Sequence, residues 1–262
     1  MDPATLIGIG LGFVVVIVAN IMEGGNPMSL LLIPPLLLVF GTTLLVCLAG
    51  STVPDAKRSF AALKTAFLGK VQPAHDVVPT VVALADKARR EGLLALEEMV
   101  ADLDDPFLVR GVSMAIDGTD PEEVREILEG QVYAKRATDK QSAKFFADAG
   151  AYAPTIGIIG TVMGLVHVLE NLAEPEELGH LIAAAFIATL WGVMSANVIW
   201  LPIASRLKRL SELEVTRMEL VIEGVAAIQS GSNPRVVAAK LYSLLPVGAE
   251  EEAAKSAQKQ AA

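Results

Sequence analysis

Cysteine and histidine are scarce in this chain of 262 residues. It has one cysteine, Cys47, and three histidines that lie far apart, at positions 75, 167 and 180. A single cysteine excludes an intrachain disulfide framework, and its apolar surroundings favour a buried thiol. There is also no His-x-x-x-His pair, no Gly-x-Ser-x-Gly and no P-loop. We therefore expect no enzymatic activity, no metal site and no cofactor.

Charged residues are missing from four long apolar blocks, although 19% of the chain is charged. About 20 apolar residues, at about 1.5 Å each, cross the hydrocarbon layer of a membrane as a helix. The sequence therefore predicts an all-α, polytopic membrane protein with four transmembrane helices and a helical cytoplasmic domain. The predicted spans are roughly Pro3–Met22, Met28–Gly50, Ala149–Leu169 and Leu181–Ile203.

The positions of the basic residues predict the orientation in the membrane. All 21 lysines and arginines fall between Lys57 and Lys144 or from Arg206 onward. The two short connections, Glu23–Pro27 and Glu170–His180, contain carboxylates but no lysine or arginine. Because basic residues mark cytoplasmic segments, both termini are expected in the cytoplasm.

The alternation of apolar and polar stretches divides the chain into five segments. Residues 1–50 form the first two predicted transmembrane helices, 51–147 the cytoplasmic domain, and 148–204 the third and fourth transmembrane helices. Residues 205–246 are expected to form cytoplasmic C-terminal helices. The tail, 247–262, is rich in Ala, Glu, Lys and Gln and is expected to be disordered. A helix that begins near Asp120-Pro121 is expected to continue into the third span.

The third span carries small residues at helical spacing. Pro154, Gly157, Thr161 and Gly164 share one face, and Gly160-x-x-x-Gly164 lies beside it. Small residues let a neighbouring backbone approach closely, which is how helices associate in lipid. This face is therefore predicted to pack against another helix.

The fourth span has a similar face, with Thr189, Gly192 and Ala196 at helical spacing and Ala188 in a second row of small residues. No span contains an ionisable residue away from its ends, and a chain that conducts ions alone usually needs one. Two readings of Thr161 and Thr189 remain open. Each hydroxyl could bond to a carbonyl of its own helix, or both could face a partner helix that supplies the charge.

The cytoplasmic domain contains a run with charges of both signs, from Arg89-Arg90 to Glu97-Glu98, around a short apolar core. A solvated helix face is the ordinary reading of such a run. A docking surface is the alternative, because surface charges set the orientation and rate of an encounter.

These motifs together resemble the MotA/PomA proteins of bacterial flagellar stators. The resemblance runs in matching order to about Pro246 and rests on the following stretches: Ile33-Pro34-Pro35 with Gly41-Thr42, Arg89 to Glu97, Ala153-Pro154 to Gly164-Leu165, Leu178-Gly179, Ala188 to Gly192, Ala196-Asn197 and Pro202-Ile203-Ala204. It implies a stator subunit in the inner membrane that turns ion flow into torque.

The resemblance also implies partners and residue roles. Five copies would surround a MotB-like, single-span, peptidoglycan-binding protein whose membrane helix carries an ion-binding aspartate. Pro154 and Pro202 would couple ion passage to movement, and Thr161 and Thr189 would line the ion path with Ala188 beside them. The charged run, including Arg90 and Glu98, would contact the rotor protein FliG.

The transported ion and two other functions stay open. Sodium-type members often have a Thr-Thr pair where this chain has Ala188-Thr189, so protons are expected, with sodium as the alternative. An ExbB/TolQ-like energiser would be expected to have three spans. A secondary transporter would need internal symmetry and a substrate pocket at mid-membrane, which the sequence lacks.

Overall fold

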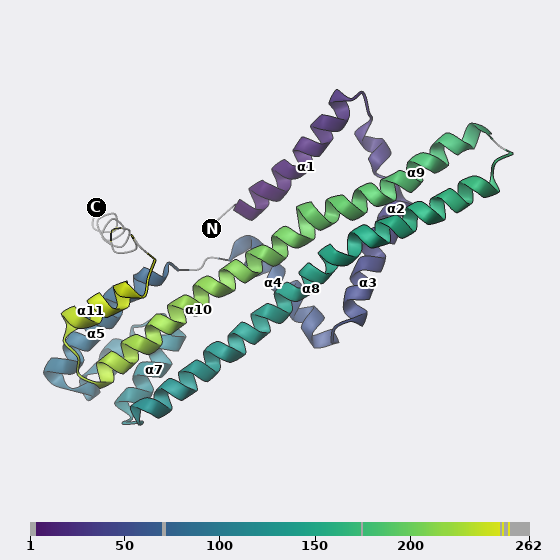
Figure 1. The fold of residues 1–262 in the computed structure, drawn as a ribbon. Helices are drawn as coiled ribbons and strands as arrows, with labels where there is room; N and C mark the ends of the chain where they lie inside the picture. The colour runs from purple at the N-terminus through teal and green to yellow at the C-terminus, as the bar shows by residue number, and fades with distance from the viewer. Residues whose placement is uncertain (1–3, 70–71, 174, 247, 249–250, 252–262) are drawn as a thin grey trace. The chain divides into compact units, whose positions relative to one another are not determined.

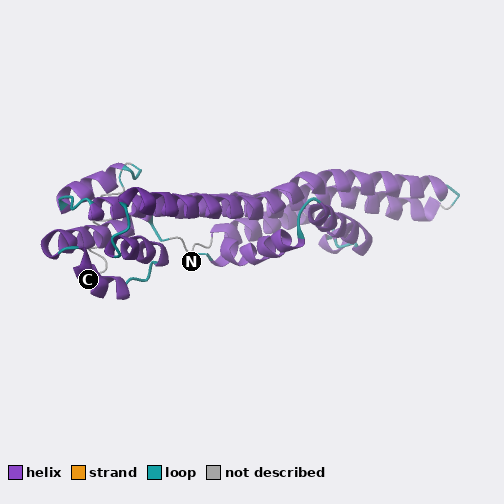
Figure 2. Ribbon diagram, turned by 90° about the horizontal axis from the view of Figure 1, so that it is seen from below, coloured by secondary structure: helices purple, strands orange, loops and turns teal. Residues whose placement is uncertain are grey.

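The computed structural model describes residues 4–69, 72–173, 175–246, 248 and 251, and within these ranges every regular element is a helix (Figures 1 and 2). Most of the predicted tail at 247–262 lies outside the described residues. The chain divides into two compact units. Unit 1 contains residues 1–70 and 139–210, and unit 2 contains residues 71–138 and 211–262. Both α8 and α10 contribute to each unit.

Unit 1 begins with an apolar helix that has almost no protein around it. Helix α1 (Ala4–Met22) has no buried residue, and Leu6, Val15 and Met22 are more than half exposed. Exposed side chains of this kind are stable in lipid and costly in water. The remaining short elements of unit 1 are η1 (Pro27–Leu30), α2 (Ile33–Leu36), η2 (Leu37–Gly41), α3 (Thr42–Ala49) and α4 (Val53–Leu68).

The second apolar block is shorter as a helix than the sequence suggested. Its first residues form the separate 3-10 turn η1, and the helix itself covers 17 residues from Ile33 to Ala49. Pro34 and Pro35 fit this start, since their missing N–H groups fall in the first helical turn, where they have no helical partner. A π-helical turn, η2, follows directly.

Among the residues that the structure describes, three helices are long and apolar enough to span a membrane. They are α1, α8 (Pro121–Glu170), and the joined helix that comprises α9 (Pro175–Met194), the π-turn η5 (Ser195–Trp200) and α10 (Leu201–Gln229). The antiparallel pair α8 and α9 lies side by side within unit 1 (Figure 1). The protein is thus an all-α membrane protein, and the number of four spans stays a prediction.

An aromatic group fills the core of unit 1. The rings of Phe146 and Trp200 stack with centroids 6.4 Å apart, and Phe40 meets Trp200 edge-on at 6.0 Å. Both Phe146 and Trp200 are buried. Offset and edge-on aromatic pairs add stability beyond their buried area. This group ties the second apolar block to α8 and η5.

Unit 2 consists of helices packed around one apolar core. Its elements are η3 (Ala74–Asp76), α5 (Val77–Glu91), η4 (Leu93–Leu96), α6 (Glu97–Ala101), α7 (Pro106–Ile116), the first part of α8, the second part of α10 and α11 (Pro234–Ser243). Val81, Leu84, Leu128, Val221 and Leu241 are each fully buried in one apolar cluster.

Residues 93–101 form two short helical elements rather than one helix. Leu93–Leu96 forms a 3-10 turn, and only Glu97–Ala101 is α-helical. Gly92, at φ +88°, turns the chain sharply between α5 and η4. In contrast, the helix expected to begin near Asp120 does continue into the third apolar block, since α8 runs for 50 residues.

Candidate functional site

Glycines bring the backbones of α8 and α9 into direct contact. A Cβ atom added to Gly192 would lie 2.7 Å from the carbonyl oxygen of Ala153 and 3.0 Å from the Cα of Gly157. One added to Gly157 would lie 2.9 Å from the Ala188 carbonyl oxygen. The obstacles are backbone atoms, which cannot rotate away. These glycines are therefore required by the close packing of the two helices.

The rest of the predicted packing face lies on the same contact. A Cβ atom added to Gly160 would lie 2.6 Å from the Cβ of Ala188, and one added to Gly164 would lie 2.5 Å from the Cβ of Ala185. Ala188 and Ala196 are buried, at 2% and 1% exposure. Small residues on both helices thus make a short interhelical distance possible. They pack α8 against α9 of the same chain, and their predicted packing around a partner stays a prediction.

A cluster of oxygen atoms lies within this contact. The hydroxyls of Thr161 and Thr189 are hydrogen-bonded to each other, although they are 28 residues apart. Thr161 Oγ1 lies 3.2 Å from the Gly157 carbonyl oxygen and 3.1 Å from that of Ala185, and Thr189 Oγ1 lies 3.2 Å from the Gly157 carbonyl oxygen. Both side chains are half-buried.

The first of the two interpretations holds for Thr161 only, because Thr161 reaches a carbonyl of its own helix whereas Thr189 reaches one of the facing helix α8. Thr161 also reaches the facing helix α9 of the same chain. Whether both threonines face a partner helix stays a prediction. Each hydroxyl has one proton and two lone pairs, so the four oxygens offer more acceptors than donors. Oxygen atoms of this kind suit a hard cation or a chain of proton-carrying waters. No carboxylate lies within either predicted span to supply a negative charge.

Two prolines lie within the helices that form the third and fourth apolar blocks. Pro154 lies inside α8, which remains helical around it. Pro202 follows the π-turn η5. A proline has no N–H to donate and its ring crowds the preceding turn, and a widened turn gives that ring room. The structure thus places both prolines within continuous helices, where their predicted coupling role stays a prediction.

Trp191 has a contact that the sequence did not reveal. Its Nε1 donates a hydrogen bond of 2.7 Å to the carbonyl oxygen of Leu30, at the end of η1. Its ring also packs against Phe13 at 6.3 Å and Phe40 at 5.8 Å. The carbonyl of Leu30 is 161 residues away in the sequence. It belongs to the main chain, so the side chain at position 30 does not indicate the contact. Trp191 therefore fixes the connection between the first two apolar blocks onto α9.

Replacement of Trp191 by phenylalanine is expected to loosen residues 27–31. A net hydrogen bond of about 1 kcal/mol corresponds to about fivefold in a local opening equilibrium. Hydrogen–deuterium exchange of amides in this segment should therefore become about fivefold faster. Trp200 provides the matched control, because its Nε1 is buried without a hydrogen-bond partner among the described residues. Equal exchange rates in Trp191→Phe and Trp200→Phe would contradict the assignment.

The four residues predicted to contact the rotor lie on two neighbouring turns of unit 2. Arg89 and Arg90 are in the last turn of α5, and Glu97 and Glu98 begin α6. All four are exposed. Arg90 pairs with Asp86 at 2.7 Å and Glu98 with Lys87 at 3.8 Å, whereas no ion pair among the described residues involves Arg89 or Glu97. The structure thus places the four residues at the end of α5 and the start of α6, and their contact with the rotor stays a prediction.

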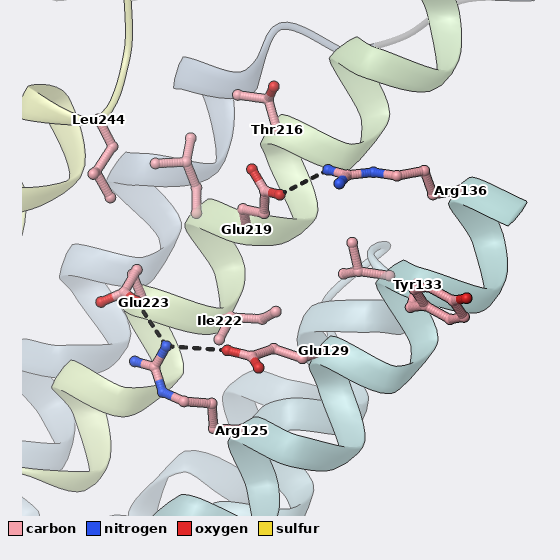
Figure 3. Close-up of a pocket in the computed structure, with 11 residues that line it drawn as sticks. Arg125, Glu129, Tyr133, Arg136, Thr216, Glu219, Ile222, Glu223 and Leu244 are labelled. Atoms are coloured by element: carbon pink, nitrogen blue, oxygen red, sulfur yellow. Dashed lines mark hydrogen bonds and ion pairs between the residues drawn. The ribbon is translucent and has the colours of Figure 1, made fainter. Parts of the chain in front are cut away.

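A hollow of about 440 Å³ in unit 2 lies between α8, α10 and Leu244 (Figure 3). Arg125 bonds to Glu223 at 2.9 Å, and Arg136 bonds to Glu219 at 3.0 Å. The bond to Arg125 holds the pKa of the Glu223 carboxyl below its usual value, and the bond to Lys240 acts in the same direction. The reciprocal bond raises the pKa of Arg125. Both arginines are thus already paired, and the network joins α8 to α10.

A comparison with models of known families indicates the class of protein. The model of the MotA/TolQ/ExbB proton channel family matches residues 100–220. This region contains all of α8 and α9, and with them the threonine cluster. The match points to the class of MotA/TolQ/ExbB channel proteins.

Similar proteins narrow this class. The chain is 39% identical over 253 residues to motility protein A of Bacillus subtilis (strain 168), covering 94% of this chain and 92% of that protein. The structure of the flagellar MotAB stator complex from Bacillus subtilis contains a chain that matches with a TM-score of 0.88 and 37% identity, over 94% of this chain and 98% of that one. The structure of C. jejuni MotAB gives a TM-score of 0.90 and 30% identity, over 94% and 97%. The chain belongs to the motility protein A family and is a subunit of a bacterial flagellar stator.

Proposed function

We propose that this subunit surrounds a MotB-like partner and that the two together conduct ions to turn the rotor. The observation that carries the proposal is the pair of bonded hydroxyls, Thr161 and Thr189, at the glycine-lined contact of two predicted spans that contain no carboxylate. Such a site can contact an ion but cannot neutralise it. A single-span partner with a membrane aspartate supplies the missing charge.

The proposed ion is a proton, with sodium as the alternative. The proton is preferred because Ala188 precedes Thr189, where sodium-type members often have a second threonine. Protonation of the partner's aspartate removes a costly charge from the membrane interior. The neutral partner helix can then pass the threonine cluster, and helices that contain Pro154 and Pro202 change position with each ion. The site is in the inner membrane, with both termini in the cytoplasm.

The proposed assembly has five copies of this chain around the partner, and the partner holds the complex to peptidoglycan. In this assembly the exposed residues Arg89, Arg90, Glu97 and Glu98 face charged residues of the rotor protein FliG. An ExbB/TolQ-like role remains the second candidate, because the matching family model includes these proteins. Expression of this chain and its partner in a strain that lacks its own stator genes separates the two roles. A flagellar stator restores swimming, whereas an ExbB/TolQ-like energiser does not.

Reversal of the charges at Arg89 and Glu97 tests the rotor contact. With Arg89→Glu and Glu97→Lys and a limiting supply of stators, we expect swimming speed to fall severalfold, because like charges would meet across the interface. Opposite changes on FliG should restore part of the speed. The matched control is Arg58→Glu, at an exposed arginine of unit 1. Full speed in the double variant at normal membrane abundance would disprove the contact.

A further inference from the structure

Two polar side chains of unit 1 are exposed at membrane depth. Asn197 lies in η5 within the fourth apolar block, and Tyr152, 43% exposed, lies in α8 within the third. Among the described residues, the Asn197 Nδ2 donates to the Val193 carbonyl oxygen at 2.8 Å, and the side-chain Oδ1 has no partner. The Tyr152 hydroxyl has no hydrogen bond within the described residues either. Such groups are unfavourable next to lipid, so protein is expected to cover them.

Each polar group lies in a row of exposed apolar side chains. On α9, Phe186, Leu190 and Val193 precede Asn197. On α8, the exposed residues Thr155, Ile159, Val162 and Val166 follow Tyr152 at alternating steps of three and four, which places them on one helix face. The Thr155 hydroxyl already donates to the Tyr152 carbonyl oxygen at 2.8 Å. Two such faces on the same unit, each with one polar group whose hydrogen-bonding capacity is unused within the described residues, suit contact with another helical surface of the same kind.

The two groups lie at the same depth. Gly150 on α8 lies against Leu201, and Gly157 lies against Gly192, so the helices run antiparallel with a defined register. Tyr152 lies two residues after Gly150, which corresponds to residue 199, two residues before Leu201. It also lies five residues before Gly157, which corresponds to residue 197, five residues after Gly192. Tyr152 is therefore level with residues 197–199. A ring of copies around an axis along the membrane normal preserves depth. Residues that meet between neighbouring copies must therefore lie at equal height.

We infer that the Tyr152 hydroxyl of one copy donates a hydrogen bond to Asn197 Oδ1 of the neighbouring copy. Within the part of the chain that the structure describes, the tyrosine hydroxyl is a donor without an acceptor, and the amide oxygen is an acceptor without a donor. Because the two groups lie on different helices and do not bond within one chain, the contact is heterologous, which is the kind of contact that a ring of copies requires. The inference rests on the proposed assembly of several copies around a partner.

Chemical cross-linking tests this contact. Cys47 is the only cysteine, so Cys47→Ala gives a background without thiols. In that background, Tyr152→Cys and Asn197→Cys are combined, expressed with the partner, and treated with a short bismaleimide. A disulfide is unsuitable because a Tyr–Asn hydrogen bond keeps the Cβ atoms too far apart. Swimming before treatment shows that the variant is folded and assembled.

The expected product is a ladder of dimers, trimers and larger linked species, because every copy carries both cysteines. Each single-cysteine variant should give no ladder, and co-expression of the two singles should give dimers at most. Val166→Cys with Asn197→Cys is the matched control, since Val166 lies on the same face of α8 but at another depth. This control should remain monomeric on a denaturing gel.

Two outcomes would overturn the inference. One is absence of the ladder in a complex whose native mass, without the reagent, shows several copies. The other is cross-linking of either cysteine to the single-span partner instead, assayed with a partner variant that carries a cysteine in its membrane helix. A native mass with one copy would instead contradict the proposed assembly itself, so the two failures are distinguishable.

Discussion

Replacement of Gly192 by valine is expected to abolish swimming in a strain that depends on this chain. The first added carbon alone would lie 2.7 Å from the Ala153 carbonyl oxygen, and the branches of valine would extend further into α8. Overpacking by even one methylene typically costs about 1–3 kcal/mol. Since backbone atoms are the obstacle, α8 and α9 must move apart. The Thr161–Thr189 bond would then be broken.

The measurement is swimming in soft agar together with the amount of the subunit in membranes. Gly179→Val is the matched control on the same helix, because nothing lies within 4 Å of a Cβ added there. The control is expected to swim at close to the original speed. Normal swimming of the Gly192 variant at normal abundance would show that the two backbones need not touch.

Replacement of Thr189 by valine is expected to reduce ion flux about tenfold or more without loss of assembly. Valine has the shape of threonine but no hydroxyl, so the packing of the glycine face is retained. Hydrogen bonds between membrane helices contribute about 0.6 kcal/mol on average, too little to dissociate the complex. An interaction of about 1.4 kcal/mol lost in the limiting step of transport lowers its rate about tenfold.

Flux is measured in vesicles that contain the subunit and its partner, with pH-sensitive and sodium-sensitive dyes in parallel. Thr189→Ser keeps the hydroxyl and is the matched control, which should conduct well. Valine and serine variants with equal flux would exclude a role for the hydroxyl in the ion path. The dye that responds in the original protein also identifies the transported ion.

Much of the membrane region follows from simple rules of the sequence. Gly157, Gly160 and Gly164 predicted a helix contact, and the structure provides one. The rules did not identify the facing residues, because small residues at helical spacing occur on both helices and a one-dimensional pattern has no register. The bond between Thr161 and Thr189 depends on that register, so it could not be deduced from either helix alone.

Other features left no signal in the sequence. The partner of Trp191 is the main-chain carbonyl of Leu30, and any residue at position 30 would provide the same group. The division of residues 93–101 follows from how Leu96 reaches the core of unit 2, where it is fully buried. Helical periodicity does not distinguish a 3-10 turn from an α-helix over four residues. Such details depend on tertiary packing.

The contact between Gly157 and Gly192 also limits how the sequence can change over evolutionary time. In most helix interfaces a larger residue on one side can be accommodated by a smaller residue opposite. Here both positions already hold the smallest residue, and the nearest obstacles are main-chain atoms, which no substitution removes. No second-site replacement on the facing helix can therefore rescue a side chain at either position. Suppressors of such variants are expected only where they alter the path of a whole helix.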